Sequence, residues 1–242
     1  MTSEPGAAVP PNRPDGILTR VYGVVRYPRA TLTAVAALPR WIGILAILTI
    51  ATAGSRVAVF ETEVGQQALV DEWDRTAAAF GQEVDDTRYA EFRALSAHGV
   101  AYGLGMALLS GPALALVVSG VIYAVFGGLQ ASFAQVWAVV VYASIPLALR
   151  QIVASVTTYV SETTTSATSI GTWWPTLNEA SAAGRFLGQL DLFVMWWVVL
   201  LAIGVSVLYQ RNPRRMALTF LGAYAGLALL LAGTMAALGG TA

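Results

Sequence analysis

Three ionisable side chains, Arg56, Arg150 and Asp191, lie inside or at the edge of runs that are otherwise apolar. A charge at the centre of a membrane costs at least about 2.5 kcal/mol on insertion scales, so such a group must face a partner, a cavity or the membrane surface. We predict that Asp191 forms an ion pair with Arg150 or with Arg56. A site for a substrate or a lipid headgroup is a second interpretation, and coupling to transport is a third.

Residue types needed for catalysis or metal binding are scarce. The chain has no cysteine and a single histidine, His98, and all 14 of its basic residues are arginine. Thiolate chemistry, two-histidine metal sites and lysine-containing phosphate loops are therefore excluded. No HExxH or GxSxG motif is present, and the acids of residues 61–98 lack EF-hand spacing. The sequence predicts a protein that is not an enzyme, holds no cofactor or metal and does not bind nucleic acid.

Small residues recur at every fourth position between residues 99 and 119, and a shorter pattern lies near the carboxyl terminus. The first set is Gly99, Gly103, Ala107, Gly111, Ala115 and Ser119, and the second is Gly222 and Gly226. In lipid, small side chains let helix backbones approach closely, which is the usual basis of tight helix packing. We expect these positions to form contacts within the chain, and an interface between two copies is the alternative.

The composition is that of an integral membrane protein. The 242 residues are 56% hydrophobic and 12% charged, whereas soluble domains have roughly 25% charged residues. About 20 apolar residues cross the hydrocarbon core as a helix, and five stretches qualify. They are Trp41 to Phe60, Ala101 to Phe126, Ala134 to Tyr159, Asp191 to Tyr209, and Met216 to Leu238. The predicted fold class is all-α, a polytopic membrane protein with five transmembrane helices.

Arginine positions predict the orientation, because positively charged short loops stay on the cytoplasmic side. Residues 1–40 contain five arginines, and the link between the last two spans contains three more. The link over residues 61–98 instead has three arginines against nine acids. We therefore expect a cytoplasmic amino terminus, an outward carboxyl terminus and an outer position for residues 61–98.

Two regions outside the spans have helical patterns. Residues 1–40 should be a cytoplasmic tail with an amphipathic interfacial segment, whose valines and Ile17 and Leu18 face the acyl chains, broken at Pro28 and Pro39. Residues 41–242 should form the membrane domain. Its outer link, residues 61–98, should add one or two short helices as a cap, with Leu69, Trp73, Ala77 and Phe80 as an apolar stripe.

The third span has a turn before it and a proline within it. Gly127 and Gly128 should form the tight turn that follows the second span. Pro146 should kink the third span one turn before Arg150 and direct that guanidinium inward. After this span, a run of 11 Ser or Thr residues and the pair Trp173 and Trp174 should form an outer loop on the membrane surface.

Three segments together resemble bacterial Yip-domain proteins, a family named for the eukaryotic Ypt/Rab-interacting membrane proteins. The segments are "VVRYPRATLTAVAALPRW", "FGGLQASFAQVWAVVVYASIPLAL" and "LDLFVMWWVVLLAIGVSVLY", in this order. The resemblance implies five helices, a cytoplasmic amino terminus and an outward carboxyl terminus. Its eukaryotic members are non-enzymatic adaptors for prenylated Rab GTPases, a role that the short proline-rich tail of this chain gives no reason to carry over.

The sequence as a whole predicts a non-enzymatic scaffold or accessory subunit. Its partners would be membrane lipids and either another membrane protein or a second copy of the chain. The alternative is a small-molecule or lipid transporter with a cavity between the third and fourth spans. The arginine-only basicity and alanine-rich spans suggest a GC-rich genome, and hence a bacterial inner membrane as the location.

Overall fold

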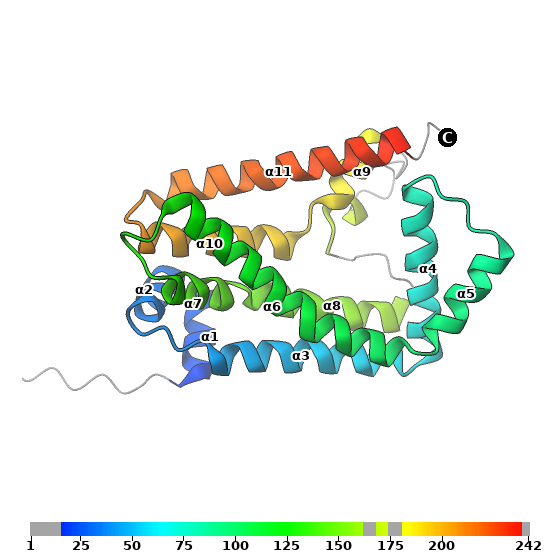
Figure 1. Cartoon of the computed structure of the whole chain (residues 1–242), viewed down its shortest axis with the longest axis horizontal. Coiled ribbons are helices and arrows are strands. Elements are labelled where there is room, and N and C mark those ends of the chain that lie inside the picture. The colour runs from blue at the N-terminus through cyan, green and yellow to red at the C-terminus, as the bar shows by residue number, and fades with distance from the viewer. Residues whose placement is uncertain (1–15, 162–167, 174–180, 239–242) are drawn as a thin grey trace, which may run out of the picture.

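The computed structural model describes residues 16–161, 168–173 and 181–238, and this part of the chain is helical apart from links and one isolated bridge between Ser169 and Asp191. Long helices lie side by side, and short helices cross their ends (Figure 1). The helices are α1 (Ile17–Arg26), α2 (Pro28–Ala37), α3 (Ile42–Phe60), α4 (Glu63–Ala79), α5 (Asp86–Ser96), α6 (Gly99–Phe126), α7 (Phe133–Ala143), α8 (Ile145–Ser161), the 3₁₀ turn η1 (Ile170–Trp173), α9 (Ala182–Gln189), α10 (Leu192–Leu208) and α11 (Pro213–Leu238).

Four helices of the described chain are long and apolar enough to cross a membrane: α3, α6, the combined α7–α8 helix and α11. A fifth apolar helix, α10, has 17 residues, at the short limit for a spanning helix. It is also more buried than α6 or α11, whose many exposed leucines suit contact with lipid. The chain is therefore a multi-pass membrane protein with at least four candidate spans.

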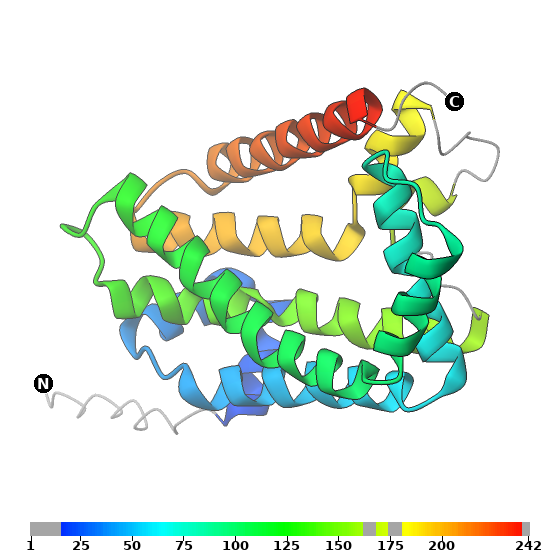
Figure 2. The ribbon, with the colours of Figure 1, turned by 45° about the vertical axis from the view of Figure 1, so that its right-hand side comes forward.

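The bundle has two distinct ends. At one end lie α1, α2 and the links 127–132 and 209–212, which we call the α2 end (Figure 1). At the other lie α4, α5, α9 and η1, which we call the α4 end; α4 and α5 stand across the ends of the long helices (Figure 2). Successive long helices run in alternating directions between these two ends.

A compact apolar core fills the α2 end. Leu32 and Val35 of α2 and Val136, Val140 and Val205 of α7 and α10 have no exposed surface. Gly204 of α10 is one reason for the close contact, because an added Cβ would collide with the side chain of Val139. The link 127–132, which leads into α7, is also held in place. Gln135 completes a capping box with Ser132 and donates a 2.9 Å hydrogen bond to the carbonyl of Ala36.

The segment before the first span differs from the expected interfacial helix. It is broken at Tyr27, directly before Pro28, as the proline predicted. Leu18 is 79% exposed, but Val24 is fully buried, and Val21 packs against the core. The prediction that all these apolar residues face acyl chains is therefore wrong for Val21 and Val24, because α1 and α2 pack on the bundle.

The acidic link forms the two short helices expected of a cap. The Thr62 and Asp85 side chains accept hydrogen bonds from the first turns of α4 and α5 and so begin each helix. In the predicted stripe, Leu69 and Ala77 are buried, and Trp73 meets Phe92 and Tyr102 edge to face, while Phe80 stays exposed.

The third span is interrupted at Ser144, between α7 and α8. Pro146 has no backbone N–H, so it cannot donate the hydrogen bond that would continue the helix, and the break falls two residues before it. The Ser144 hydroxyl donates a 2.9 Å hydrogen bond to the carbonyl of Val140, so this hydroxyl has a partner at the break. The turn before this span also agrees with its glycines, since Gly127 has a φ of 79°.

Candidate functional site

Arg150 and Asp191 form an ion pair near the α4 end. The Arg150 Nε lies 2.6 Å from Asp191 Oδ2, and their side chains are 40% and 7% exposed. Arg150 is on α8, one and a half turns after the Ser144 break, and Asp191 directly precedes α10. The sequence offered Arg150 and Arg56 as partners for Asp191, and the structure pairs Asp191 with Arg150.

Asp191 also joins three other parts of the bundle. Its Oδ1 accepts hydrogen bonds from the backbone N–H groups of Phe193 and Val194, so it is the N-cap of α10. Its Oδ2 accepts a second bond, of 2.5 Å, from the Thr168 hydroxyl. The Tyr224 hydroxyl of α11 accepts from the Asp191 N–H at 3.0 Å and donates to the Gln189 carbonyl at 2.7 Å. The Asp191 carboxylate thus joins α8, α10 and residue 168, and the Asp191 backbone N–H adds the contact with α11.

Arg56 has a different environment. Its Nη2 donates a 3.0 Å hydrogen bond to Gln151 Oε1, which is next to Arg150 on α8. No carboxylate in the described chain lies within ion-pair distance of it. Glu72 of α4 attracts it from farther away, and Arg150 repels it. Arg56 is therefore a half-buried cation on a membrane helix whose direct partner is a neutral amide.

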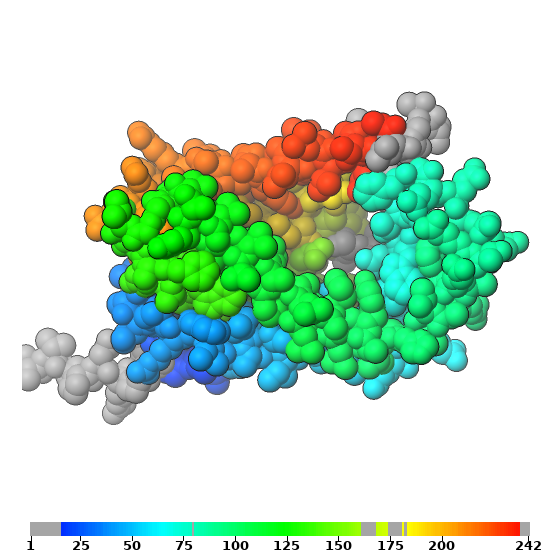
Figure 3. Space-filling model, viewed as in Figure 1, coloured from blue at the N-terminus to red at the C-terminus, as the bar shows by residue number. Residues whose placement is uncertain are grey.

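Both arginines line one cavity of about 370 Å³, bounded by α3, α6, the α7–α8 helix and α10. The space-filling view shows a hollow between α6 and α11 (Figure 3); of these two helices, α6 contributes residues to the cavity lining. Along α3 the lining runs from Leu45 to Arg56, about 16 Å at the helical rise of 1.5 Å per residue. Arg56, Arg150 and Gln151 lie toward the α4 end, and Leu45 lies toward the α2 end.

The middle of the cavity is less polar than its residue names suggest. Thr52 donates its hydroxyl proton to the backbone of its own helix, at 2.9 Å from the Leu48 carbonyl oxygen, and Ser144 does the same. Around them lie Leu48, Leu114, Val141, Leu147, Val194 and Trp197. The cavity thus combines a largely apolar shaft with guanidinium groups near one end.

The small-residue positions fall into two groups. Added Cβ atoms would meet Phe60 at 3.3 Å from Gly99 and at 2.7 Å from Gly103, and Ala107 is 4% exposed. These three positions allow α6 to lie close to α3.

At Gly111, Gly222 and Gly226, by contrast, an added Cβ would have no neighbour within 4 Å. The expectation of contacts within the chain is wrong for these three glycines. Gly111 lines the cavity instead, because the helices leave a space where its side of α6 faces inward.

Several residues of this region were missed by the sequence reasoning. Gln151 could have been recognised, because it is an uncharged polar residue beside an arginine in an apolar run. Thr168 is one of 11 similar hydroxyl residues, and Tyr224 lies on a distant helix. Neither residue could be recognised as part of the site from the sequence. Trp197 lines the cavity, and its buried indole N–H has no hydrogen-bond partner in the described chain.

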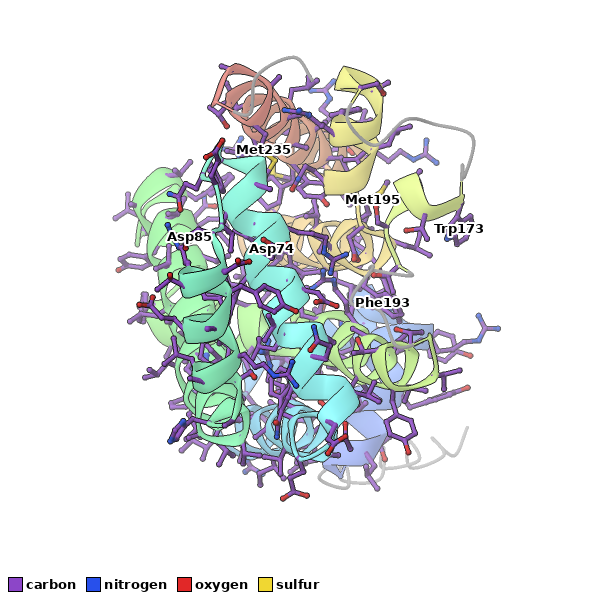
Figure 4. All side chains as sticks on the ribbon, turned by 90° about the vertical axis from the view of Figure 1, so that its right-hand side faces the viewer. Asp74, Asp85, Trp173, Phe193, Met195 and Met235 are labelled. Carbon is purple, nitrogen blue, oxygen red and sulfur yellow. The ribbon has the colours of Figure 1, made fainter. Side chains whose placement is uncertain are left out.

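The surface of the α4 end separates into two regions (Figure 4). Asp74 and Asp85 lie on the cap formed by α4 and α5, whereas Trp173 of η1 lies at the opposite edge of this view. Trp173 is 67% exposed, as expected of a residue in the headgroup layer. Trp174, the second tryptophan of the predicted surface loop, lies outside the described residues.

A family comparison agrees with this architecture. The model of the Yip1 domain matches residues 22–236, which is most of the chain. No curated protein and no solved structure matches it. The match begins within α1, ends two residues before the end of α11 and includes every residue that lines the cavity. The chain therefore belongs to the Yip1 domain family of membrane proteins.

Proposed function

We propose that this protein is a non-enzymatic lipid-binding scaffold or accessory subunit of a membrane assembly. The cavity between α3, α6, the α7–α8 helix and α10 is the observation that carries this proposal. A volume of 370 Å³ is within the range of ligand pockets, about 300–1,000 Å³. Its apolar shaft suits an acyl chain, and three of the helices that bound it are candidate membrane spans.

A matched pair of substitutions tests lipid binding. Gly111→Leu adds a side chain where the cavity is open, and Gly222→Leu adds the same side chain to open space on α11, outside the cavity lining. We expect Gly111→Leu to reduce the lipid retained by the purified protein, measured by native mass spectrometry, and Gly222→Leu to leave it unchanged. Equal lipid retention by the two variants and the unmodified protein would contradict the proposal.

The proposal includes five spans, with the α2 end in the cytoplasm. Support comes from α10, which runs between the two ends although it is short, and from the arginines of α1, α2 and the 209–212 link, which lie at one end. The acidic α4–α5 cap lies at the other end. A bacterial inner membrane is the location that this orientation and the arginine-only composition favour.

Because the chain has no cysteine, single introduced cysteines report the orientation directly. Gln82 lies between α4 and α5, and Asn212 lies between α10 and α11; both are exposed. In intact cells, a membrane-impermeant maleimide should label Gln82→Cys and should label Asn212→Cys only after the membrane is opened. The reverse pattern would overturn the orientation, and labelling of both variants would argue against five spans.

Transport is the second candidate function, and the position of two arginines in one cavity favours it. A transporter must open this cavity to both sides of the membrane, whereas a lipid-binding scaffold need not. Proteoliposomes that contain the protein should therefore show no faster movement of labelled lipid or small anions than empty vesicles. Faster movement that is abolished by Gly111→Leu would support the transporter instead.

A further inference from the structure

We infer that the cavity binds the phosphodiester group of an anionic phospholipid, with Arg56 as its main contact. This inference rests on the proposed lipid binding and names the chemical class of the ligand. The charges of the lining residues provide the first argument. Asp191 offsets Arg150 at 2.6 Å. In the described chain, by contrast, the direct hydrogen-bond partner of Arg56 is the neutral Gln151, and Glu72 lies beyond ion-pair distance. Among the described residues, the lining contains two arginines and no acid, and Asp191, which lies behind Arg150, offsets one of them, so one positive charge remains to match the single negative charge of a phosphodiester.

Unused hydrogen-bond donors are the second argument. A guanidinium has five N–H donors, and the described chain takes one of them from Arg56, at Nη2. Arg150 donates to Asp191 through Nε, and no described residue accepts from its Nη groups. Two guanidinium groups that line the same cavity therefore retain donors, in the planar arrangement that suits phosphate oxygens.

The shape of the cavity is the third argument. The arginines lie toward the α4 end, and the lining then continues for about 16 Å toward Leu45, with Leu48, Leu114 and Val141 along it. An amphiphile whose anionic group lies at Arg56 would place its acyl chain along this shaft. In the proposed orientation, this is a lipid of the outer leaflet. A small free anion would fill only the end near Arg56.

Native mass spectrometry tests the headgroup. The protein is reconstituted in vesicles of equal parts phosphatidylglycerol and phosphatidylcholine and then extracted. Both lipids have a phosphodiester, but the choline cation makes phosphatidylcholine neutral overall and would be repelled by the arginines, so we expect about tenfold more phosphatidylglycerol to be retained. Arg56→Gln should remove this preference, and Arg211→Gln, which changes an exposed arginine of the 209–212 link, should retain it. An unchanged preference in Arg56→Gln would overturn the inference.

Two further arms separate the remaining outcomes. If Arg56→Gln does not fold, Gly111→Leu keeps Arg56 and fills the shaft, and it should also abolish the preference; a preference that persists in this variant contradicts the inference. In the second arm, inorganic phosphate is added at millimolar concentration. Failure to displace phosphatidylglycerol supports a lipid headgroup, and complete displacement means that the site takes a free phosphate.

The failure of this inference is distinguishable from the failure of lipid binding. Equal retention of the two lipids, both reduced by Gly111→Leu, would leave the proposed function intact and exclude selective binding of an anionic headgroup at Arg56. Retention that Gly111→Leu leaves unchanged for both lipids would contradict the proposed function itself.

Discussion

The two ends of the bundle are built in different ways. At the α2 end, α2, α7 and α10 meet through fully buried aliphatic side chains such as Leu32 and Val136. At the α4 end, the helices are joined by polar contacts centred on Asp191, and a cavity of about 370 Å³ separates their apolar surfaces. The first arrangement excludes ligands and the second has room for one.

This difference follows from the physics of packing in lipid. Apolar side chains gain little by leaving lipid for protein, so helices associate through close packing and hydrogen bonds. The α2 end uses close packing, which Gly204 permits. The α4 end uses hydrogen bonds, which can hold helices a short distance apart. A cavity can therefore persist there without loss of the fold.

The largest expected effect tests the packed end. Leu32→Ala removes a fully buried side chain from α2 and should lower the free energy of unfolding by about 2–5 kcal/mol. Leu18→Ala on α1, where Leu18 is 79% exposed, is the control and should change it by less than about 0.5 kcal/mol. Thermal unfolding in detergent measures both. Equal small effects would mean that α2 is a surface attachment instead of part of the core.

The next effect tests the polar end. Asp191→Asn removes the charge that pairs with Arg150 but keeps an N-cap residue for α10. Hydrogen bonds to charged groups contribute about 1.5–3 kcal/mol, and we expect the lower part of this range because the Arg150 side chain is 40% exposed.

A double-mutant cycle isolates the contribution of the pair. Arg150→Gln should destabilise the protein by a similar amount, and the double variant should be little less stable than either single variant. The same unfolding measurement applies to all three variants. Strictly additive losses would show that the two residues act independently and would remove the ion pair from the account of the α4 end.

A smaller effect tests the wall of the cavity. Gly103→Ala would place a Cβ 2.7 Å from the Phe60 ring and 3.2 Å from the Cβ of Arg56, so it should cost about 1 kcal/mol. Gly105→Ala on the same helix has no neighbour within 4 Å and should be neutral or slightly stabilising. If both changes are neutral in thermal unfolding, α6 moves freely against α3 and the cavity has no fixed wall.

The sequence predicted the elements better than the spaces between them. Apolar runs located the long helices, and Pro146 located the break in the third span within two residues, because both signals are local. Asp191 was singled out because a charged side chain next to a membrane helix needs a partner. The choice between Arg56 and Arg150 depends on which helices are neighbours, which a single sequence does not encode locally.

The sequence offered a cavity between the third and fourth spans only as part of the transporter alternative, whereas the observed cavity is also bounded by α3 and α6. Gly111 continues the spacing of Gly99 and Gly103, so the pattern predicted close packing at all three positions. The difference arises from the arrangement of α3, α6 and α10 in space, which brings Phe60 against Gly103 and leaves Gly111 facing open volume.

A density map of the protein in nanodiscs formed with its native lipids tests the central claim most directly. We predict density for an anionic headgroup within hydrogen-bond distance of the Arg56 guanidinium, continuous with an acyl chain along the shaft toward Leu45, and a closed core around Leu32 and Val136. A cavity filled by protein side chains, with Arg56 paired to Glu72 or another carboxylate, would contradict the account.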